Sequence, residues 1–566
     1  MRKLIFVCIV LCVMAAFTAG QSVYAATNPT SVANNKFGIH LAVPNKDDLH
    51  SAAQLVNSSG GQWGYVTVVI QENDRNVGKW QEIFNEMRRL KLIPIIRIAT
   101  QPEGSVWRKP SADDADAWIA FFQQLNWVVK NRYIVLFNEP NHASEWGGAV
   151  NPEEYAKVSA GFAKKLRAAG SDYFIMLAGL DLSAPSQGVA YEDAGNFYSR
   201  MFSEVDGGTW NELIDGLSSH AYPNPGFTGS PYNRGRISIG GYEWELSYLA
   251  SLGISKPLPV FITETGWRSG SITEEDVSQY MVTAYRNLWL QDERVVAVTP
   301  FVLSYQSEPF LGFSWKKQGM HEFYPVYQAV QAIEKAKGAP VQHHSLKVMS
   351  DMPSALTSAS TIVFTMRIKN EGQAIIDGMD YRIAINNLPK GTTARVSQPS
   401  QPIEPGTEAA VSVSITTGTE QSQSKANVEL VQGSESIGQV YAWNMEVIPK
   451  ISLKILVQRL FGFGSSVDQY EVQLFDNEER MVFRQVDVIA ENGVIFLDRV
   501  PNLIVGREYR IVVLRPYYLP RQSYVTIQKD GNEVSVKRML PLDPNNDGKF
   551  SVGDVITFIP NAYRYL

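Results

Sequence analysis

Two short motifs in the sequence place a glutamate directly after an apolar run. One is Asn-Glu-Pro at 138–140 and the other is Thr-Glu-Thr-Gly-Trp at 263–267, so that Glu139 and Glu264 are 125 residues apart. A carboxylate at the end of a buried strand loses hydration, and it therefore needs a charged partner or acquires a shifted pKa. Two such groups can divide the work, since a protonated carboxyl donates to a leaving oxygen while an ionised one attacks carbon. We take Glu139 and Glu264 as the candidate catalytic pair.

The residues around these motifs predict the elements that position them. Near-continuous apolar runs alternate with amphipathic segments from 36 to 338, as expected of buried parallel strands connected by helices. The expected strands are 37–43, 65–71, 92–99, 133–138, 174–180, 214–220, 260–263 and 295–303. The main expected helices are 79–90, 115–129, 152–169, 194–205, 242–252, 274–290 and 325–337. Eight strands in this rhythm predict an α/β fold of the (β/α)8 TIM-barrel type, in which active sites form at the C-terminal ends of the strands. A doubly wound open sheet is the alternative.

The two motifs, at the ends of the fourth and seventh expected strands, resemble those of the clan A glycoside hydrolases. The resemblance covers about 300 residues of the chain. It implies a retaining mechanism in which Glu139 is the acid/base and Glu264 is the nucleophile. It also implies that Asn138 bonds the sugar 2-hydroxyl. Paired carboxyl groups about 5–5.5 Å apart are typical of that mechanism.

Four further residues in or next to the expected strands are candidates for the same site. His220 and Tyr222 end the sixth strand, and a Tyr hydroxyl that donates to Glu264 would keep this carboxylate ionised. Arg97 lies within the apolar run 95–98 and needs an anionic partner, for which Glu264 is our prediction. His40 ends the first strand and could bond a substrate hydroxyl. A purely structural role remains the alternative for each of the four.

Aromatic residues after strand ends are candidates for sugar contact, because an indole can stack on a sugar ring while its N–H donates to a hydroxyl. The tryptophans in such places are Trp107, Trp146, Trp267 and Trp315. The resemblance implies a tryptophan at the end of the eighth strand, but the chain has Leu-Ser-Tyr-Gln at 303–306 instead. We expect Tyr305 or Trp315 to take this place.

After about residue 340 the pattern changes to short alternating strands with polar turns, which is typical of all-β structure. The segment 340–449 has the length and strand spacing of an immunoglobulin-like β-sandwich. A second β-sandwich-like module is expected over 450–542.

The C-terminal segment 543–566 contains a second chemical motif, with oxygen-bearing residues in calcium-loop spacing. The expected ligands are Asp543, Asn545, Asp547, the carbonyl of Lys549, Ser551 through water, and Asp554. The motif resembles one dockerin-type repeat, and a plain Asx-rich turn is the alternative. Dockerins carry two repeats and this chain ends twelve residues after Asp554. A structural Ca²⁺ is therefore preferred to docking on a cohesin-like scaffold.

The N-terminus predicts export. Arg2 and Lys3 precede an apolar run over 4–17 and a small-residue cleavage site at 23–25, so we expect a signal peptide over 1–25 rather than a membrane anchor. Both cysteines, Cys8 and Cys12, lie inside it, which excludes disulfides in the mature chain.

Composition and motifs exclude several classes of function. A net charge of −6 without a long basic run argues against nucleic acid as the partner. No zinc spacing, Walker loop, GxGxxG or G-x-S-x-G motif occurs, so catalysis is expected to need no cofactor.

The sequence therefore predicts a secreted retaining glycosidase acting on an oligo- or polysaccharide, with β linkages expected. A non-catalytic glycan-binding or scaffold protein and a transglycosylase are the alternatives. The sugar, the choice between internal and terminal cleavage, the role of the β modules and the oligomeric state are not predicted from sequence.

Overall fold

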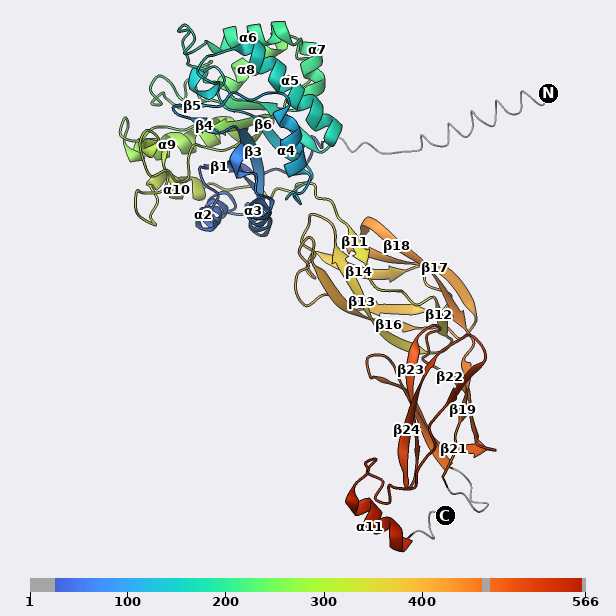
Figure 1. The fold of residues 1–566 in the computed structure, drawn as a ribbon. Coiled ribbons are helices and arrows are strands. Elements are labelled where there is room, and N and C mark those ends of the chain that lie inside the picture. Colours follow the sequence, from blue (N-terminus) through green and yellow to red (C-terminus); the bar gives the residue numbers. More distant parts are fainter. Residues whose placement is uncertain (1–25, 461–468, 562–566) are drawn as a thin grey trace, which may run out of the picture. The chain divides into compact units, whose positions relative to one another are not determined.

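The computed structural model describes residues 26–460 and 469–561, and the chain divides into two compact units, 1–343 and 344–566 (Figure 1). We describe each unit by itself. The signal peptide expected over 1–25 lies outside the described residues, as does 562–566 of the expected C-terminal segment. In the part of the chain that the structure describes, no helix has both the length and the apolar content needed to cross a bilayer.

Eight parallel strands form the core of the first unit. They are β1 (Lys36–Leu41), β2 (Gly64–Gln71), β3 (Leu92–Ala99), β6 (Arg132–Leu136), β7 (Tyr173–Leu177), β8 (Leu217–His220), β9 (Val260–Glu264) and β10 (Val295–Val298). Their hydrogen-bonded order is β7-β6-β3-β2-β1-β10-β9-β8. A parallel bridge between Met176 and Gly216 connects the two ends of this order and closes the sheet. The closed barrel confirms the predicted fold and excludes the open sheet.

Helices lie between successive strands and surround the barrel (Figure 1). They are α2 (Lys46–Val56), α3 (Val77–Arg89), α4 (Asp114–Phe122), α5 (Pro152–Ala169), α6 (Ala194–Glu204), α7 (Gly207–Leu213), α8 (Gly241–Ser251), α9 (Glu274–Ala284) and α10 (Pro325–Gln331). A π-helical turn, Tyr285–Trp289, continues α9. Short polar residues set the first turns: the Asn151 side chain accepts from Glu154 N ahead of Pro152, and the Thr273 side chain accepts from Asp276 N.

Short elements complete the loops at the strand ends. They are the β4–β5 hairpin (Pro102–Glu103 and Val106–Trp107) and the turns η2 (Glu72–Asp74), η3 (Ala143–Glu145) and η5 (Leu311–Phe313), while the turn η1 (Pro29–Ser31) precedes β1.

The eighth strand ends five residues earlier than predicted, at Val298 instead of residue 303. The sequence over 295–303 is apolar apart from Thr299, but only its first part pairs with neighbouring strands. The remainder, including the buried residues Phe301 and Val302, is loop beyond the strand end. This boundary decides which aromatic residue reaches the site described below.

The second unit begins with two four-stranded sheets. One has the order β11-β13-β16-β15 and the other β12-β18-β17-β14. Their bounds are β11 Leu346–Val348, β12 Ala355–Thr357, β13 Thr361–Asn370, β14 Tyr381–Asn386, β15 Thr393–Val396, β16 Glu408–Thr416, β17 Ser422–Gln432 and β18 Glu435–Ile448. Alternate residues of both sheets, such as Phe364, Met366, Val428 and Leu430, bury in one core. This is the sandwich arrangement expected for 340–449.

The remaining strands form one seven-stranded sheet of order β24-β23-β20-β21-β22-β19-β25. They are β19 Ile451–Leu456, β20 Gln469–Phe475, β21 Met481–Glu491, β22 Val494–Val500, β23 Glu508–Arg515, β24 Tyr518–Thr526 and β25 Asn532–Ser535. The long strand β21 pairs with β20 over most of its length and with β22 at its end, so it joins two parts of one sheet. The expected second sandwich is therefore a continuous sheet that encloses its own core. The last helix is α11 (Val552–Asn561).

Candidate active site

A cavity of about 530 Å³ opens at the C-terminal ends of the barrel strands. All eight strands or the loops that follow them contribute to its lining, from His40 in β1 to Phe313 after β10. Glu139 and Glu264 both line it, as do Arg97, Asn138 and Tyr222. The two motifs far apart in the sequence thus meet at the edge of the barrel where enzymes of this fold carry their chemistry.

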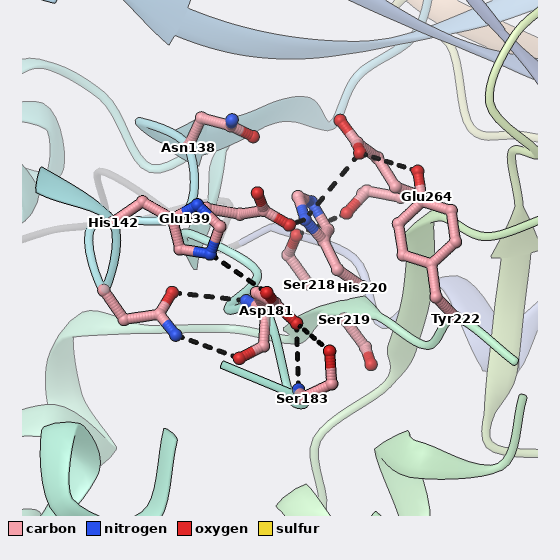
Figure 2. Close-up of polar contacts among 12 residues, drawn as sticks. Asn138, Glu139, His142, Asp181, Ser183, Ser218, Ser219, His220, Tyr222 and Glu264 are labelled. Atoms are coloured by element: carbon pink, nitrogen blue, oxygen red, sulfur yellow. Dashed lines mark hydrogen bonds and ion pairs between the residues drawn. The ribbon is translucent and has the colours of Figure 1, made fainter. Parts of the chain in front are cut away.

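His220 lies between the two glutamates (Figure 2). Its Nδ1 is 2.8 Å from Glu139 Oε1 and 3.9 Å from Glu264 Oε2. One carboxylate oxygen of each glutamate and a ring nitrogen of His220 all lie within 4.8 Å of one another. The two carboxylates are therefore close enough to act on the same bond. The three ligand atoms could also gather around a metal ion, but Arg97 already supplies a positive charge beside Glu264.

Glu264 is buried among donors. Arg97 Nη1 pairs with Oε1, and the Tyr222 hydroxyl donates to Oε2 over 3.0 Å. Burial raises the pKa of Glu264, but the positive charges of His220 and Arg97 outweigh it and hold the pKa well below its usual range. This carboxylate is ionised at neutral pH and fixed in orientation. The ion pair expected between Arg97 and Glu264 is present.

Glu139 is half-buried and projects from an unusual turn. Phe137 has φ +75° and Glu139 has φ +29°, both in the left-handed region that non-glycine residues rarely occupy. The Glu139 N–H donates to the Gly179 carbonyl beyond β7 over 3.2 Å, which holds the turn in place. Such strain is common where a side chain is held for chemistry.

His220 is buried and packs against the backbone of the neighbouring strand end. A Cβ at Gly179 would lie 2.3 Å from His220 Cδ2, so only glycine leaves room for the ring. Burial lowers the pKa of His220, but the negative charge of Glu264 and the hydrogen bond with Glu139 raise it above its ordinary value.

Asn138 lies beside the pair (Figure 2), and its Oδ1 accepts a hydrogen bond from Arg97 Nη1 over 2.7 Å. Arg97 therefore binds both Glu264 and the residue before Glu139.

His40 points into the cavity with unused hydrogen-bonding capacity. It is 2 % exposed, neither ring nitrogen has a hydrogen-bond partner among the described residues, and Nε2 is 4.0 Å from Glu264 Oε1. Burial, with the nearby charge of Arg97, lowers the pKa of His40 to about 3, so the ring is neutral. A neutral imidazole with unpartnered nitrogens is suited to bonding a hydroxyl group.

Three tryptophans expected to contact sugar do not line the cavity. Trp146 packs against Phe137 and Tyr155. Trp267 donates to the Gly229 carbonyl over 2.7 Å, and Trp315 is 3 % exposed beside it. Each indole follows a strand end but turns into the packing around the barrel, so these three predictions are corrected. Of the aromatic candidates, Trp107 and Tyr305 do line the cavity.

The cavity also has an aromatic wall that the sequence did not reveal. Its rings are Phe227, Phe301, Tyr305, Phe310 and Phe313. Phe301 lies 5.1 Å from the His40 ring and 5.3 Å from Phe310, measured between ring centroids. Phe301, the third residue after the end of β10, lines the cavity. Its place in the cavity was not predicted, because the eighth strand was expected to continue to residue 303.

Three titratable lining residues were also missed, namely His142, Glu145 and Asp181. His142 and Asp181 form an ion pair of 3.0 Å on the side of Glu139 away from Glu264 (Figure 2). In the sequence these three residues are distinguished only by lying a few positions after an expected strand, and many other residues do the same.

The C-terminal loop shows part of the expected calcium geometry. The buried Asp543 carboxylate accepts from the Asp547 and Gly548 N–H groups over 3.0 Å each, and Gly548 has φ +75°. Asp554 is also buried and accepts from Ser551 N over 2.7 Å. The expected ligand atoms of this loop are all oxygens, the element that Ca²⁺ binds in proteins. However, within residues 26–460 and 469–561 the only group of three His, Cys, Asp or Glu ligand atoms within 4.8 Å of one another is the one at the barrel. Calcium binding by Asp543, Asn545, Asp547, Lys549, Ser551 and Asp554 stays a prediction.

No protein-family profile and no curated protein matches the chain. Solved structures that resemble it include an endo-β-1,4-glucanase from Xanthomonas axonopodis pv. citri carrying a triple mutation, with 12 % identity over 52 % of this chain and 98 % of that one and a TM-score of 0.37. A mannanase catalytic domain from Streptomyces sp. SirexAA-E has 16 % identity over 56 % and 91 %, with a TM-score of 0.36. A family 51 α-L-arabinofuranosidase from Bifidobacterium longum has 11 % identity over 70 % and 98 %, with a TM-score of 0.36. At these values we draw no functional argument from the likeness.

Proposed function

We propose that the chain is a retaining glycoside hydrolase with Glu264 as nucleophile and Glu139 as acid/base. One observation carries the proposal: oxygens of the two carboxylates approach within 4.8 Å across the cavity. Retaining enzymes bring the pair this close because one carboxylate itself attacks the sugar, whereas inverting enzymes leave space for a water between them.

The surroundings of the two glutamates fit different tasks. In the first step, the ionised Glu264 carboxylate attacks the anomeric carbon, the bond to the leaving oxygen breaks, and the proton of Glu139 passes to that oxygen. In the second step, the Glu139 carboxylate takes a proton from water while the water oxygen attacks the same carbon and releases Glu264. Before the first step and after the second, Arg97 keeps Glu264 ionised, and its hydrogen bond with Tyr222 orients it.

The neighbouring polar groups fit the binding of the reacting sugar. We assign Asn138 to the sugar 2-hydroxyl, His40 to another hydroxyl, and His220 to holding Glu139 and Glu264 in their relative positions. Tyr305 and Phe301, in the aromatic wall, provide apolar surface for a face of the sugar ring. No cofactor is assigned to the reaction.

We extend the proposal to the rest of the chain from its sequence. The N-terminal pattern over 1–25 supports export, and the substrate is then an extracellular oligo- or polysaccharide with β linkages. The loop from Asp543 to Asp554 is assigned one structural Ca²⁺, without a scaffold partner.

The test is intact mass of the full-length protein after incubation with a panel of activated 2-fluoro glycosides. These reagents form a glycosyl-enzyme that hydrolyses slowly. We expect one adduct per chain in the wild type and none in Glu264→Gln. The sugar that labels the protein identifies the glycone. Labelling of Glu264→Gln at the wild-type rate would remove Glu264 from this role, and no adduct with any sugar would favour a glycan-binding barrel.

A further inference from the structure

An ion pair lines the active-site cavity without a part in the proposed chemistry. His142 Nε2 lies 3.0 Å from Asp181 Oδ2, and both residues line the cavity. Their side chains are 22 % and 26 % exposed, so a ligand in the cavity can reach both. The pair lies on the side of Glu139 away from Glu264 (Figure 2).

The loops after β6 and β7 hold the pair in place. The His142 N–H donates to the Glu139 carbonyl over 2.9 Å. The Asn141 side chain donates to the Asp181 carbonyl over 2.9 Å and accepts from the Asp181 N–H over 3.2 Å. The N–H and the hydroxyl of Ser183 donate to Asp181 Oδ1 over 2.8 and 2.7 Å. Both side chains therefore have a fixed place relative to Glu139 before a ligand binds.

Both side chains keep hydrogen-bonding capacity that the fold does not use. Within the described residues, Asp181 Oδ2 accepts from His142 alone, whereas a carboxylate oxygen can accept two hydrogen bonds. The contact with Asp181 occupies Nε2 of His142, and no residue in the described part of the chain bonds Nδ1. A carboxylate oxygen and a ring nitrogen are thus open to a ligand.

The charges of the pair suit a ligand that both donates and accepts. Burial raises the pKa of Asp181, but the hydrogen bonds from His142 and Ser183 outweigh it and keep the pKa below its ordinary value. Burial lowers the pKa of His142, but the hydrogen bond with Asp181 and the charge of Glu139 raise it above its ordinary value. An ionised carboxylate only accepts, while Nδ1 accepts when the ring is neutral and donates when it is charged. Hydroxyl groups meet both requirements.

The position of the pair indicates which part of a substrate it meets. In a retaining enzyme the nucleophile attacks the anomeric carbon from the side opposite to the leaving oxygen, which the acid/base protonates. Side chains beyond Glu139 therefore face the leaving group. His40, which lies 4.0 Å from Glu264, and Phe301, which contacts His40, are instead placed for the sugar that Glu264 attacks.

Building on the proposed function, we propose that His142 and Asp181 bind hydroxyl groups of the leaving group, so that the chain selects substrates whose leaving group is itself a sugar. A sugar presents hydroxyls on adjacent carbons, which can reach the carboxylate oxygen and the ring nitrogen together. A simple alkyl leaving group has no hydroxyl for either. Neither residue takes part in making or breaking bonds.

The test compares kcat/KM of full-length variants on two substrates with similarly poor leaving groups. One is the best of a panel of β-linked disaccharides whose glycone is the sugar identified by the mass experiment, and the other is the methyl glycoside of that sugar. Both need the proton of Glu139, but only the disaccharide has hydroxyls on its leaving group. We expect His142→Ala to lose about tenfold on the disaccharide, as for one hydrogen bond, and less than twofold on the methyl glycoside. Equal losses on both, or no loss on either, would overturn the proposal.

A second measurement runs the leaving-group side in reverse and serves if the methyl glycoside reacts too slowly. The 2-fluoro glycosyl-enzyme is mixed with methanol or with a panel of free sugars, and loss of the adduct is followed by mass. The acceptor hydroxyl attacks the anomeric carbon, its proton passes to the Glu139 carboxylate, and Glu264 is released. We expect a sugar to accelerate this loss in the wild type, His142→Ala to reduce that acceleration about tenfold, and the rate with methanol to stay unchanged. No acceleration by any sugar in the wild type, or the same acceleration in the variant, would overturn the proposal.

Matched controls separate binding of the leaving group from a structural role. His50→Ala removes the histidine of another His–carboxylate pair of the barrel, 2.8 Å from Glu86 and outside the cavity, and should behave as the wild type on both substrates. His142→Ser replaces the alanine variant if the latter does not fold, with the same expected selectivity. If the wild type forms no adduct and turns over no glycoside, the proposed function itself fails; if it does either and the variants lack selectivity, only the role of His142 and Asp181 fails.

Discussion

Glu139 and Glu264 carry the same functional group in very different surroundings. Glu264 is buried, the charges of His220 and Arg97 hold its pKa low, and the Tyr222 hydroxyl donates to it. Glu139 is half-buried and makes a side-chain hydrogen bond with the His220 ring. This difference assigns the ionised role to Glu264 and the proton-transfer role to Glu139.

The acid/base role of Glu139 predicts a dependence on the leaving group. Glu139→Ala should lower kcat/KM by about 10²–10⁴-fold on substrates with poor leaving groups, because these need a proton as the bond breaks. Substrates with dinitrophenyl leaving groups should remain partly active. Steady-state kinetics on a series of aryl glycosides measures the difference, and an equal loss across the series would contradict the assignment.

The packing of His220 against Gly179 predicts the effect of a single methyl group. Gly179→Ala places a Cβ 2.3 Å from the present position of His220 Cδ2, so the ring must shift away from both glutamates. Because displacements of about 1 Å at an active site can cost 10²-fold, we expect a loss in kcat/KM of about a hundredfold with the fold retained. Kinetics together with circular dichroism tests this, and wild-type activity would show that the ring position is unimportant.

At the scale of single residues, the sequence predicted the site residues that lie in or next to strands and missed those whose position depends on the path of a loop. Arg97 and Glu264 could be predicted because each lies in an apolar strand whose alternation fixes its direction, and Glu139 and Tyr222 because each follows the end of such a strand by two or three residues. Glu145 depends on the path of a turn after the strand, for which the sequence has no comparable periodic signal.

At the scale of elements, eight apolar runs predicted the barrel. The end of the eighth strand was predicted wrongly because apolar residues continue beyond the end of β10. The predicted strand was too long, although Thr299 and Pro300 interrupt the run and proline cannot donate to a strand ladder. Trp146, Trp267 and Trp315 show the converse, since an aromatic residue after a strand end can turn into the helix layer, and tertiary packing decides between the two.

The contact between α8, α6 and β8 includes a buried carboxyl outside the cavity. Glu245 on α8 accepts from the Tyr198 hydroxyl of α6 over 2.8 Å and from the Ser219 hydroxyl of β8, next to His220. Burial raises the pKa of Glu245 to about 7, more than these hydrogen bonds and the charge of His220 lower it.

This burial predicts how barrel stability depends on pH. The folded state holds the Glu245 proton more tightly than the unfolded state, so its contribution to stability is lost as pH rises from about 4.5 to 7, on the order of 3 kcal/mol. Glu245→Gln does not titrate and should remove this loss. Calorimetry of the full-length protein between pH 4.5 and 8 checks it, with the transition of residues 344–566 as an internal control. A parallel fall in the barrel transition of wild type and variant would contradict the prediction.

At the scale of the whole molecule, the division into 1–343 and 344–566 predicts that perturbations of one unit can be observed separately. The calcium motif lies in the second unit, far along the sequence from the barrel. A chelator should therefore lower the melting temperature of the second unit alone, and added Ca²⁺ should restore it.

Two variants make this test specific. Asp543→Asn removes a carboxylate from the motif and should abolish the response to chelator, whereas Asp530→Asn, at an exposed position before β25, should keep it. No recovery of the melting temperature on adding Ca²⁺ to the wild type would remove the calcium site from the proposal.

The uneven distribution of tryptophan has an optical consequence. Eleven of the twelve lie between Trp63 and Trp315, and Trp443 alone belongs to the second unit. Excitation at the red edge of indole absorption therefore reports almost entirely on the barrel, while tyrosine and peptide absorption report on both units. The full-length protein thus carries an intrinsic label that distinguishes unfolding of its barrel from unfolding of its β modules, without any dye or truncation.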